Sequence, residues 1–323
     1  MPSFKKFPYI GIDVGGTNMS AAIVDENNCP VFSIRSKTRA HLGHKSVLSR
    51  IGEMVRVIRD KVGLSQKQIA GLGIGVPGPV DIHKGMVIDA PNLGWKHLEI
   101  RNAVKDLTGL PTVLDNDVNL ALYGEVKAGS ATGCNNVLGI WTGTGVGGAL
   151  VLSNNLYHGQ HYTAGEIGHT IVLTGAGLGR ETLEDLGSRT AIVRTIKHLL
   201  QSSHPSLINE LVKGNHTKIK SKVVAKAVLS GDSLATRVVQ DAARYTGIVA
   251  ANMVTTLSLS CVVLGGGMAT ALGAPWAEWV SQSLDEYIWP KSFPKVKTVI
   301  AGLGDNSGTV GAAIAAREGC KSI

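Results

Sequence analysis

Two stretches of the chain show the same order of apolar and glycine-rich positions. In residues 9–25 (YIGIDVGGTNMSAAIVD), an apolar run leads into a glycine turn and a second apolar run leaves it. Residues 137–153 (VLGIWTGTGVGGALVLS) repeat this order. Each stretch predicts two strands joined by a tight turn. A plain β-hairpin explains either stretch alone, but the pair favours one α/β unit used twice, with a nucleotide held between the copies.

The residues at the two turns suit a phosphate group. Adjacent glycines remove every Cβ, so backbone N–H groups can converge on an anion. A carboxylate beside the first turn stands where a phosphate-bound Mg²⁺ takes an oxygen ligand. The turn residues are Asp13, Gly15, Gly16, Thr17 and Asn18 in the first stretch, and Thr142, Gly143, Thr144 and Gly145 in the second.

Elsewhere the apolar spacing alternates between helix and strand. Helical spacing is found at residues 46–62, about 100–107, 119–128, 221–229, 233–257 and 305–317. Strands are expected at residues 69–76, 112–114, 170–173, 261–264 and 296–301, with a hairpin at 80–88 and a loop at 92–95. A capping box at residues 182–185 predicts one helix running to about residue 200. This alternation is typical of an α/β protein.

Three consecutive polar residues follow the strand expected at 112–114. Asp115, Asn116 and Asp117 stand between that strand and the next helix. One of them is explained as a helix cap. Three consecutive polar residues are more than a helix cap requires, and the carboxyl end of a strand is where open α/β sheets bind ligands. We therefore predict a binding site here.

Three further segments are candidates for ligand contacts. Glu166 and His169 flank a polar, glycine-containing loop. A lone His before a strand is usually structural, whereas a Glu and a His together favour ligand binding. Glu184 lies in the first turn of a predicted helix but outside the capping box, although a Glu there gains from the helix dipole. Gly265, Gly266 and Gly267 end a predicted strand, where a base or ribose could lie against bare backbone.

Composition excludes several classes of protein. With 323 residues, 44% hydrophobic and 17% charged, the chain has room for two globular domains. Its charge-free stretches are interrupted by polar residues and Gly, so we expect no membrane span, and we see no secretory signal. The four cysteines lie far apart without a CxxC pair, which favours reduced thiols in a cytoplasmic protein.

The net charge of +8 does not by itself indicate a nucleic-acid-binding protein. The densest basic run, at residues 213–226, contains no aromatic residue on which bases could stack. A solvated helix face explains it better, and the positive field favours anionic nucleotides.

The type of nucleotide site can be narrowed from the motifs. Gly143, Gly145 and Gly148 match GxGxxG, but they open a strand pattern, whereas the dinucleotide-binding motif opens a helix. No Gly-Lys dipeptide occurs, so there is no Walker A loop. What remains is a phosphotransferase whose phosphate loops are turns between strands.

In these motifs the chain resembles the ROK group of sugar kinases, in the actin and hexokinase superfamily. DVGGTN and TGTGVGG resemble the two phosphate loops, and DNDVNLALYGE resembles the catalytic ENDANAAxxGE. GVPGPV, APNLGW, AGEIGH, LEDLGS, VVLGGG and LGDNSGTVGAA also match in order, over residues 9–313. The resemblance implies two similar α/β domains of the actin-like ATPase (ribonuclease H-like) type with a cleft between them. The expected domains are 1–118 plus about 306–323, and 119–305.

The resemblance also implies roles for the candidate residues. Asp117 would be the general base that accepts the proton of a sugar hydroxyl, and its place at a helix N-terminus keeps it ionised. Sugar hydroxyls would be bound by the backbone at Gly78 and by Asn116, Glu166, His169 and Glu184. Asp13 would hold Mg²⁺, through water, while the two turns and Gly265–267 would bind ATP. The implied enzyme is a homodimeric hexose kinase acting on a 6-hydroxyl, with glucose expected first; N-acetylglucosamine, N-acetylmannosamine and fructose are alternatives.

One departure from the family pattern concerns zinc. Many members carry CxCGxxGC before the LE pair, and its cysteines join the histidine of AGEIGH in a structural zinc site. Here Gly175, Gly177 and Thr182 take the cysteine positions, which leaves His169 without those partners. Because a single His does not hold zinc, we predict no zinc site.

Two other functions compete with a kinase. Some ROK proteins are sugar-responsive repressors with an N-terminal helix-turn-helix domain. Only eight residues precede the first predicted strand here, so DNA binding is not expected. A sugar-binding protein without catalysis is the other alternative, and the presence of Asp13, Asp117 and both turns argues against it.

Overall fold

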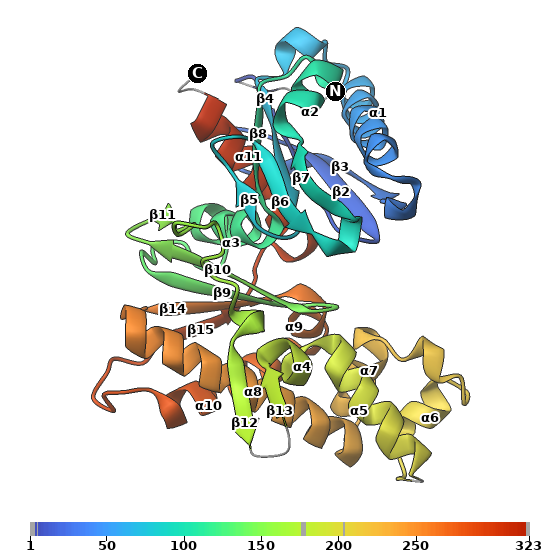
Figure 1. Cartoon of the computed structure of the whole chain (residues 1–323), viewed down its shortest axis with the longest axis vertical. Coiled ribbons are helices and arrows are strands. Elements are labelled where there is room, and N and C mark those ends of the chain that lie inside the picture. Colours follow the sequence, from blue (N-terminus) through green and yellow to red (C-terminus); the bar gives the residue numbers. More distant parts are fainter. Residues whose placement is uncertain (1–3, 5, 176–178, 203, 321–323) are drawn as a thin grey trace. The chain divides into compact units, whose positions relative to one another are not determined.

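The computed structural model describes residues 4, 6–175, 179–202 and 204–320 (Figure 1). Contacts divide the chain into two compact units. The first comprises Met1–Gly133, Leu156–Ala164 and Asp305–Ile323, and the second comprises Cys134–Asn155 and Gly165–Gly304. The first unit runs past residue 118, where we expected a boundary, because helix α3 (Asp117–Ala128) packs along helix α11 (Ser307–Gly319) of the same unit.

The first unit is built on a five-stranded sheet of order β3-β2-β1-β4-β8. Strands β1 and β2 form the first predicted hairpin, and β2 pairs with β3 antiparallel. Strand β1 pairs parallel with β4, and β4 pairs parallel with β8. The bounds are β1 (Tyr9–Val14), β2 (Asn18–Val24), β3 (Pro30–Lys37), β4 (Gly71–Val76) and β8 (Thr112–Asn116).

The main sheet of the second unit repeats this plan in the order β11-β10-β9-β14-β15. Strands β9 and β10 are antiparallel, β9 is parallel to β14, and β14 is parallel to β15. The duplication predicted from the two hairpins is therefore confirmed, with β9 and β10 in the places of β1 and β2. The bounds are β9 (Val137–Thr142), β10 (Val146–Leu152), β11 (Asn155–Leu156), β14 (Cys261–Gly265) and β15 (Lys297–Ile300).

The remaining elements of the first unit cover its sheet and extend it. Helix α11 packs on β1 and β4 through a run of small and buried residues. The apolar residues of α1 (His44–Val62) lie on one face, which is buried. Helix α2 (Arg101–Thr108) lies against α1. A smaller sheet contains β5 (Val80–Asp81), β6 (Met86–Ala90) and β7 (Trp95–Glu99). Strand β7 was not expected, since only its first residue, Trp95, is buried and the rest of the strand gives no apolar signal.

The second unit is mainly helical outside its main sheet. Helices and strands of this unit share a core that contains 36 buried apolar residues in the described part of the chain, including Trp276, which is fully buried on α10. The helices are α4 (Leu183–Gly187), α5 (Arg189–Gln201), α6 (Leu207–Leu211), α7 (Ser221–Leu229), α8 (Ser233–Leu257), α9 (Gly266–Leu272) and α10 (Ala274–Tyr287). Strands β12 (Ile171–Gly175) and β13 (Gly179–Thr182) pair antiparallel and form a two-stranded ribbon. Within the described residues, none of the helices combines the length and apolarity that crossing a membrane requires.

The prediction of one helix from residue 182 to about 200 was wrong, because the helix breaks at Ser188. The capping box of Thr182 and Asp185 is present, but it starts only the short helix α4. Ser188 has extended backbone angles (φ −69°, ψ 157°), and its hydroxyl accepts the N–H of Ala191 at 3.1 Å. Ser188 is therefore the N-cap of a second helix, which begins at Arg189.

Candidate functional site

The first glycine turn links β1 to β2 and is held from behind by Thr38. The N–H of Gly15 donates to the Asn18 carbonyl at 3.0 Å, which closes the turn. Thr38 is fully buried, and it donates its N–H to the Thr17 carbonyl and its hydroxyl to the Gly15 carbonyl. Gly16, Thr17 and Asn18 are exposed. The turn therefore presents an accessible backbone on a fixed support, as a phosphate loop requires.

Asp13, at the end of β1, is a carboxyl group with little charge compensation. Burial raises its pKa to about 6; Arg35 opposes that rise and Asp305 adds to it. Arg35 and Asp305 form an exposed ion pair at 3.5 Å, so Arg35 is shared between two carboxylates. A Cβ on Gly308 of α11 would come within 3.0 Å of Asp13 Oδ2, so backbone lies directly against the carboxyl group. A divalent cation would supply the missing positive charge, so Asp13 fits a Mg²⁺ site.

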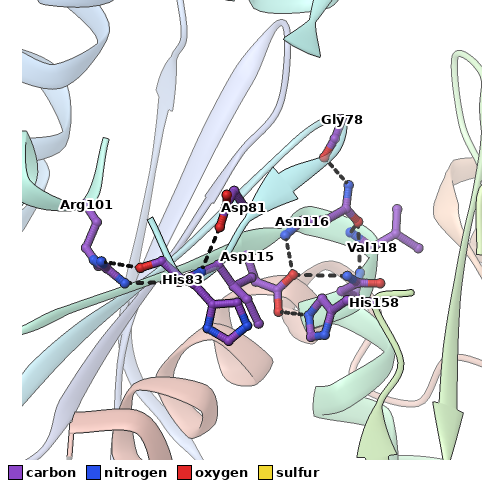
Figure 2. A network of polar contacts seen from close by, with 10 residues as sticks. Gly78, Asp81, His83, Arg101, Asp115, Asn116, Val118 and His158 are labelled. Carbon is purple, nitrogen blue, oxygen red and sulfur yellow. Dashed lines mark hydrogen bonds and ion pairs between the residues drawn. The ribbon is translucent and has the colours of Figure 1, made fainter. Parts of the chain in front are cut away.

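The polar triplet lies where β8 meets α3, as predicted, and Figure 2 shows its first two residues, Asp115 and Asn116. The side-chain oxygen of Asn116 accepts the N–H groups of Val118 and Asn119 at 2.8 and 3.0 Å, which caps α3. Its amide nitrogen donates to the Gly78 carbonyl at 3.0 Å. Asn116 thus ties the start of α3 to Gly78, and most of its hydrogen-bonding capacity serves that link.

Gly78 occupies a conformation that only glycine accepts there. Its φ is +82°, and a Cβ would lie 2.0 Å from the Asp89 carbonyl oxygen. A glycine is therefore required sterically at this turn, which fixes the Gly78 backbone beside Asn116.

Asp117 is the first residue of α3, and its side chain is half-buried. Its Oδ1 accepts the N–H of Val118 at 2.9 Å. The Cα of Asp117 lies 3.1 Å from the position of a Cβ on Gly75, so β4 passes closely beneath it. A carboxylate on the first turn of a helix gains from the helix dipole, which favours its ionised form.

Asp115 is the centre of a buried network that the sequence analysis did not identify (Figure 2). Its Oδ1 accepts the N–H of Asn116 at 2.7 Å and the side-chain amide of Asn119 at 3.0 Å. Its Oδ2 lies 2.8 Å from Nε2 of His158. Because Asp115 is only 6% exposed, these contacts fix the residue that precedes the cap of α3.

His158 was missed because no local pattern marks it. It lies 43 residues beyond Asp115, in the segment Leu156–Ala164, which belongs to the first unit although the chain on either side belongs to the second. Burial lowers the pKa of His158, but the hydrogen bond and the charge of Asp115 outweigh burial, so the pKa is raised. The pair is a charge-assisted hydrogen bond that ties Leu156–Ala164 to β8.

We expect His158→Ala to lower the free energy of unfolding by about 1.5–3 kcal/mol below pH 6.5, the range for a hydrogen bond to a charged group. The folded-state pKa is raised above the unfolded value of about 6.5. The stabilisation is therefore complete below that unfolded value and is lost as the pH rises through the folded pKa. Urea unfolding of wild type and variant between pH 5.5 and 8.5 measures the difference.

His161→Ala is the matched control, since His161 lies in the same segment and is exposed. It should leave the unfolding free energy unchanged at every pH. A loss for His158→Ala that does not vary with pH would show that the Asp115 contact does not involve the protonated ring.

In the second unit, the turn between β9 and β10 is held by the start of α5. The N–H of Gly143 donates to the Gly145 carbonyl at 2.9 Å, and the N–H of Arg189 donates to the Gly143 carbonyl at 3.0 Å. Arg189 Nη2 donates to the Thr144 hydroxyl at 2.7 Å, and the Thr190 hydroxyl donates to the Thr144 carbonyl at 2.6 Å. Among the described residues, the buried Thr142 hydroxyl has no hydrogen-bond partner.

The three residues predicted to bind sugar in this unit lie close together. Glu184 Oε2 accepts the N–H of Val146 at 2.9 Å, and it lies 2.0 Å from the position that a Cβ on Gly145 would take. Burial raises the pKa of Glu166, the Glu184 charge adds to the rise, and His169 opposes it. Glu184 thus contacts the glycine turn while interacting with Glu166, so this group adjoins the turn.

Two glycines of the triplet after β14 are required by packing against β9. A Cβ on Gly265 would lie 2.3 Å from the Trp141 ring, and one on Gly266 would lie 2.5 Å from the Thr142 carbonyl oxygen. The missing side chains at these two positions make room for β9. A Cβ on Gly267 would lie 3.4 Å from Ser221 Oγ, which is ordinary contact. A nucleotide at this triplet stays a prediction.

The residues that replace the zinc cysteines lie around the β12-β13 ribbon. Gly175 pairs with Gly179, and Thr182 pairs with Ile171. Gly177 lies outside the described residues. In the part of the chain that the structure describes, no group of three or more His, Cys, Asp or Glu side chains could hold a metal ion. The absence of zinc stays a prediction.

Two sheets of the same order, each with a glycine turn between its two central antiparallel strands, define the actin-like ATPase class, in which the ribonuclease H-like unit is duplicated. The model of the family described as "ROK family" matches residues 9–318, and this chain belongs to that family. The sequence is 30% identical to a glucokinase from Halalkalibacterium halodurans over 94% of this chain and 93% of the relative.

Solved structures of this family resemble the chain throughout. A ROK family glucokinase from Streptomyces griseus, in complex with glucose and AMPPNP, superposes with a TM-score of 0.86 at 28% identity, covering 96% of this chain and 99% of its own. A ROK hexokinase from Thermus thermophilus superposes with a TM-score of 0.78 at 28% identity, covering 98% of this chain and 100% of its own.

Proposed function

We propose that this chain is an ATP-dependent hexose kinase that transfers the γ-phosphoryl group of ATP to the 6-hydroxyl of a hexose, with glucose as the preferred substrate. The observation that carries the proposal is the placement of Asp117. It stands at the carboxyl end of a parallel strand, in a first unit whose glycine turn and Asp13 suit a magnesium-bound triphosphate. Family membership and the named glucokinase relative support the same activity.

The proposal assigns the sugar to polar groups that are already ordered. Asp117 accepts the proton of the 6-hydroxyl and orients that oxygen toward the γ-phosphorus. Carboxylates of Glu166 and Glu184 accept hydrogen bonds from other hydroxyls, and His169 and the backbone near Gly78 complete the set. The contact between Asn116 and Gly78 fixes the start of α3, so we assign Asn116 a positioning role as well as a sugar contact.

Bond changes in the proposed reaction are those of a phosphoryl transfer. A bond forms between the sugar O6 and the γ-phosphorus, the bond from that phosphorus to the β,γ-bridging oxygen breaks, and ADP leaves with its electron pair. The hydroxyl proton goes to Asp117. Mg²⁺ held by Asp13, directly or through water, would neutralise charge on the phosphates. The glycine turns would bind phosphate oxygens through their N–H groups.

A coupled assay of ADP release over a panel of hexoses tests the proposal. Glucose, N-acetylglucosamine, N-acetylmannosamine and fructose would each be supplied with ATP and Mg²⁺. We expect turnover with the highest kcat/KM for glucose. Preference for an N-acetylated sugar would keep the kinase and change its substrate. Tight binding of a sugar without turnover of any would show instead a binding protein that has lost catalysis.

We further propose a cytoplasmic homodimer, on the resemblance to the family and on the four cysteines, none of which forms a disulfide within the described residues. Light scattering at micromolar concentration tests the oligomeric state, and a mass near twice 33.8 kDa is the expected result.

A further inference from the structure

We propose that Arg189 binds phosphate oxygens of the nucleotide at the second glycine turn, and so supplies a positive charge that the turns themselves lack. The inference rests on the proposed kinase function and names a further residue for it. Phosphoryl transfer depends on neutralising charge around the transferred group. Neither residues 13–18 nor residues 142–148 contain Lys or Arg. A cation at the second turn must therefore come from another segment.

The break in the helix at Ser188 places Arg189 at this turn. Its backbone N–H donates to the Gly143 carbonyl, and its guanidinium donates to the Thr144 hydroxyl at 2.7 Å. The next residue, Thr190, donates its hydroxyl to the Thr144 carbonyl. Three hydrogen bonds thus fix the first two residues of α5 against the tip of the turn. A continuous helix from residue 182 would not begin here.

The guanidinium of Arg189 has donors to spare. A guanidinium carries five N–H groups in a planar fork, and among the described residues that of Arg189 makes one hydrogen bond, to the Thr144 hydroxyl. Within residues 4–320 as described, no carboxylate lies within 4.0 Å of Arg189. Arg189 is half-buried, so its charge is only partly screened by water. Arginine in this state suits the planar, bidentate recognition of phosphate.

The space beside the turn agrees with a bound anion. Apart from its chain neighbours, no atom of the described residues lies within 4 Å of the position that a Cβ on Gly143 would take, so the turn is open at that residue. The buried Thr142 hydroxyl at the entrance to the turn has no hydrogen-bond partner among the described residues. Arg189 also begins a helix of 13 residues, whose N-terminal N–H groups and dipole add to the positive potential.

Isothermal calorimetry with ATP, ADP and adenosine tests the proposal independently of turnover. We expect Arg189→Gln to weaken ATP binding by about 10- to 100-fold, the range for a lost hydrogen-bonded charge contact, and to leave adenosine unchanged. Arg189→Lys should recover part of the affinity because it keeps the charge but loses the fork. Lys197→Gln is the matched control: it removes a charge from the same helix about two turns further on, and should leave ATP affinity unchanged.

A double-mutant cycle with Thr144→Val separates phosphate binding from support of the turn. If Arg189 binds phosphate, Arg189→Gln weakens ATP binding in the Thr144→Val background as well. If Arg189 only holds the Thr144 hydroxyl, the second substitution adds nothing, and the proposal is overturned. ATP affinity within twofold of wild type in Arg189→Gln would overturn it too.

Different results would contradict the kinase function and the role of Arg189. Wild-type protein that binds ATP through Arg189 but phosphorylates no hexose would remove the proposed function and keep the phosphate contact. Wild-type protein that turns over glucose, with an Arg189→Gln variant of unchanged KM for ATP and unchanged kcat, would keep the function and remove the contact.

Discussion

Asp117→Asn should lower kcat by about 10²–10⁴-fold, the usual contribution of general acid–base catalysis. The dissociation constants for hexose and ATP should stay within a few-fold of wild type. Asn is nearly isosteric with Asp and keeps an oxygen that can accept the Val118 N–H, so the start of α3 should be preserved. What is lost is the group that takes the hydroxyl proton. Steady-state kinetics with glucose and calorimetry for each substrate measure the two effects separately.

Asp232→Asn provides the matched control for this change. Asp232 is the N-cap of α8, where its side chain accepts the Ala235 N–H at 2.7 Å, so the same chemical substitution occurs at another helix start. Asp232→Asn should leave kcat unchanged because Asp232 has no assigned role in the reaction. Retention of kcat within threefold by Asp117→Asn would show that Asp117 is not the base.

Gly311→Ala should have the largest effect on stability, with a loss of about 2–3 kcal/mol in the free energy of unfolding. A Cβ on Gly311 would lie 1.7 Å from the Leu120 carbonyl oxygen, so α11 and α3 touch backbone to backbone. Overpacking costs about 1–3 kcal/mol and occasionally more, and so close an approach to a backbone atom lies at the upper end, at about 3–4 kcal/mol. Ala regains up to about 1 kcal/mol of helix propensity. Because α3 begins with Asp117, kcat should fall as well. Urea unfolding and the glucose assay measure both.

Gly52→Ala is the control for the substitution itself. Gly52 lies inside helix α1, and the atom nearest to its Cβ position is Cδ2 of Leu107, at 2.8 Å. Leu107 is 51% exposed and its side chain can rotate away, whereas the Leu120 carbonyl in α3 cannot. Gly52→Ala should therefore be neutral or stabilising by up to about 1 kcal/mol. Equal losses in the two variants would contradict the packing argument.

Local patterns in the sequence were sufficient for the framework of the fold. Apolar runs on both sides of a glycine turn predicted β1-β2 and β9-β10, and their repetition predicted the duplicated sheet. The Asp-Asn-Asp triplet was placed correctly at the junction of β8 and α3 because capping residues and strand ends carry strong local signals.

Other features depended on contacts that no local pattern records. The capping box at Thr182 predicted a helix start correctly, but Ser188 forms a second cap, and mid-helix Ser gives no distinct signal without tertiary contacts. His158 pairs with a carboxylate far away in sequence, and spacing cannot reveal such a partner. The close packing of Gly265 and Gly266 against β9 likewise depends on contacts that no spacing in the sequence records.

The position of α11 in the sequence has a consequence for how the chain folds. This helix covers β1 and β4, yet it follows β8 only after the entire second unit has been synthesised. Until then the nascent first sheet exposes apolar strands, the state in which growing polypeptides aggregate or recruit chaperones. The first sheet should therefore be completed only after the second unit has been made, and contacts of such long sequence separation should make this step slow.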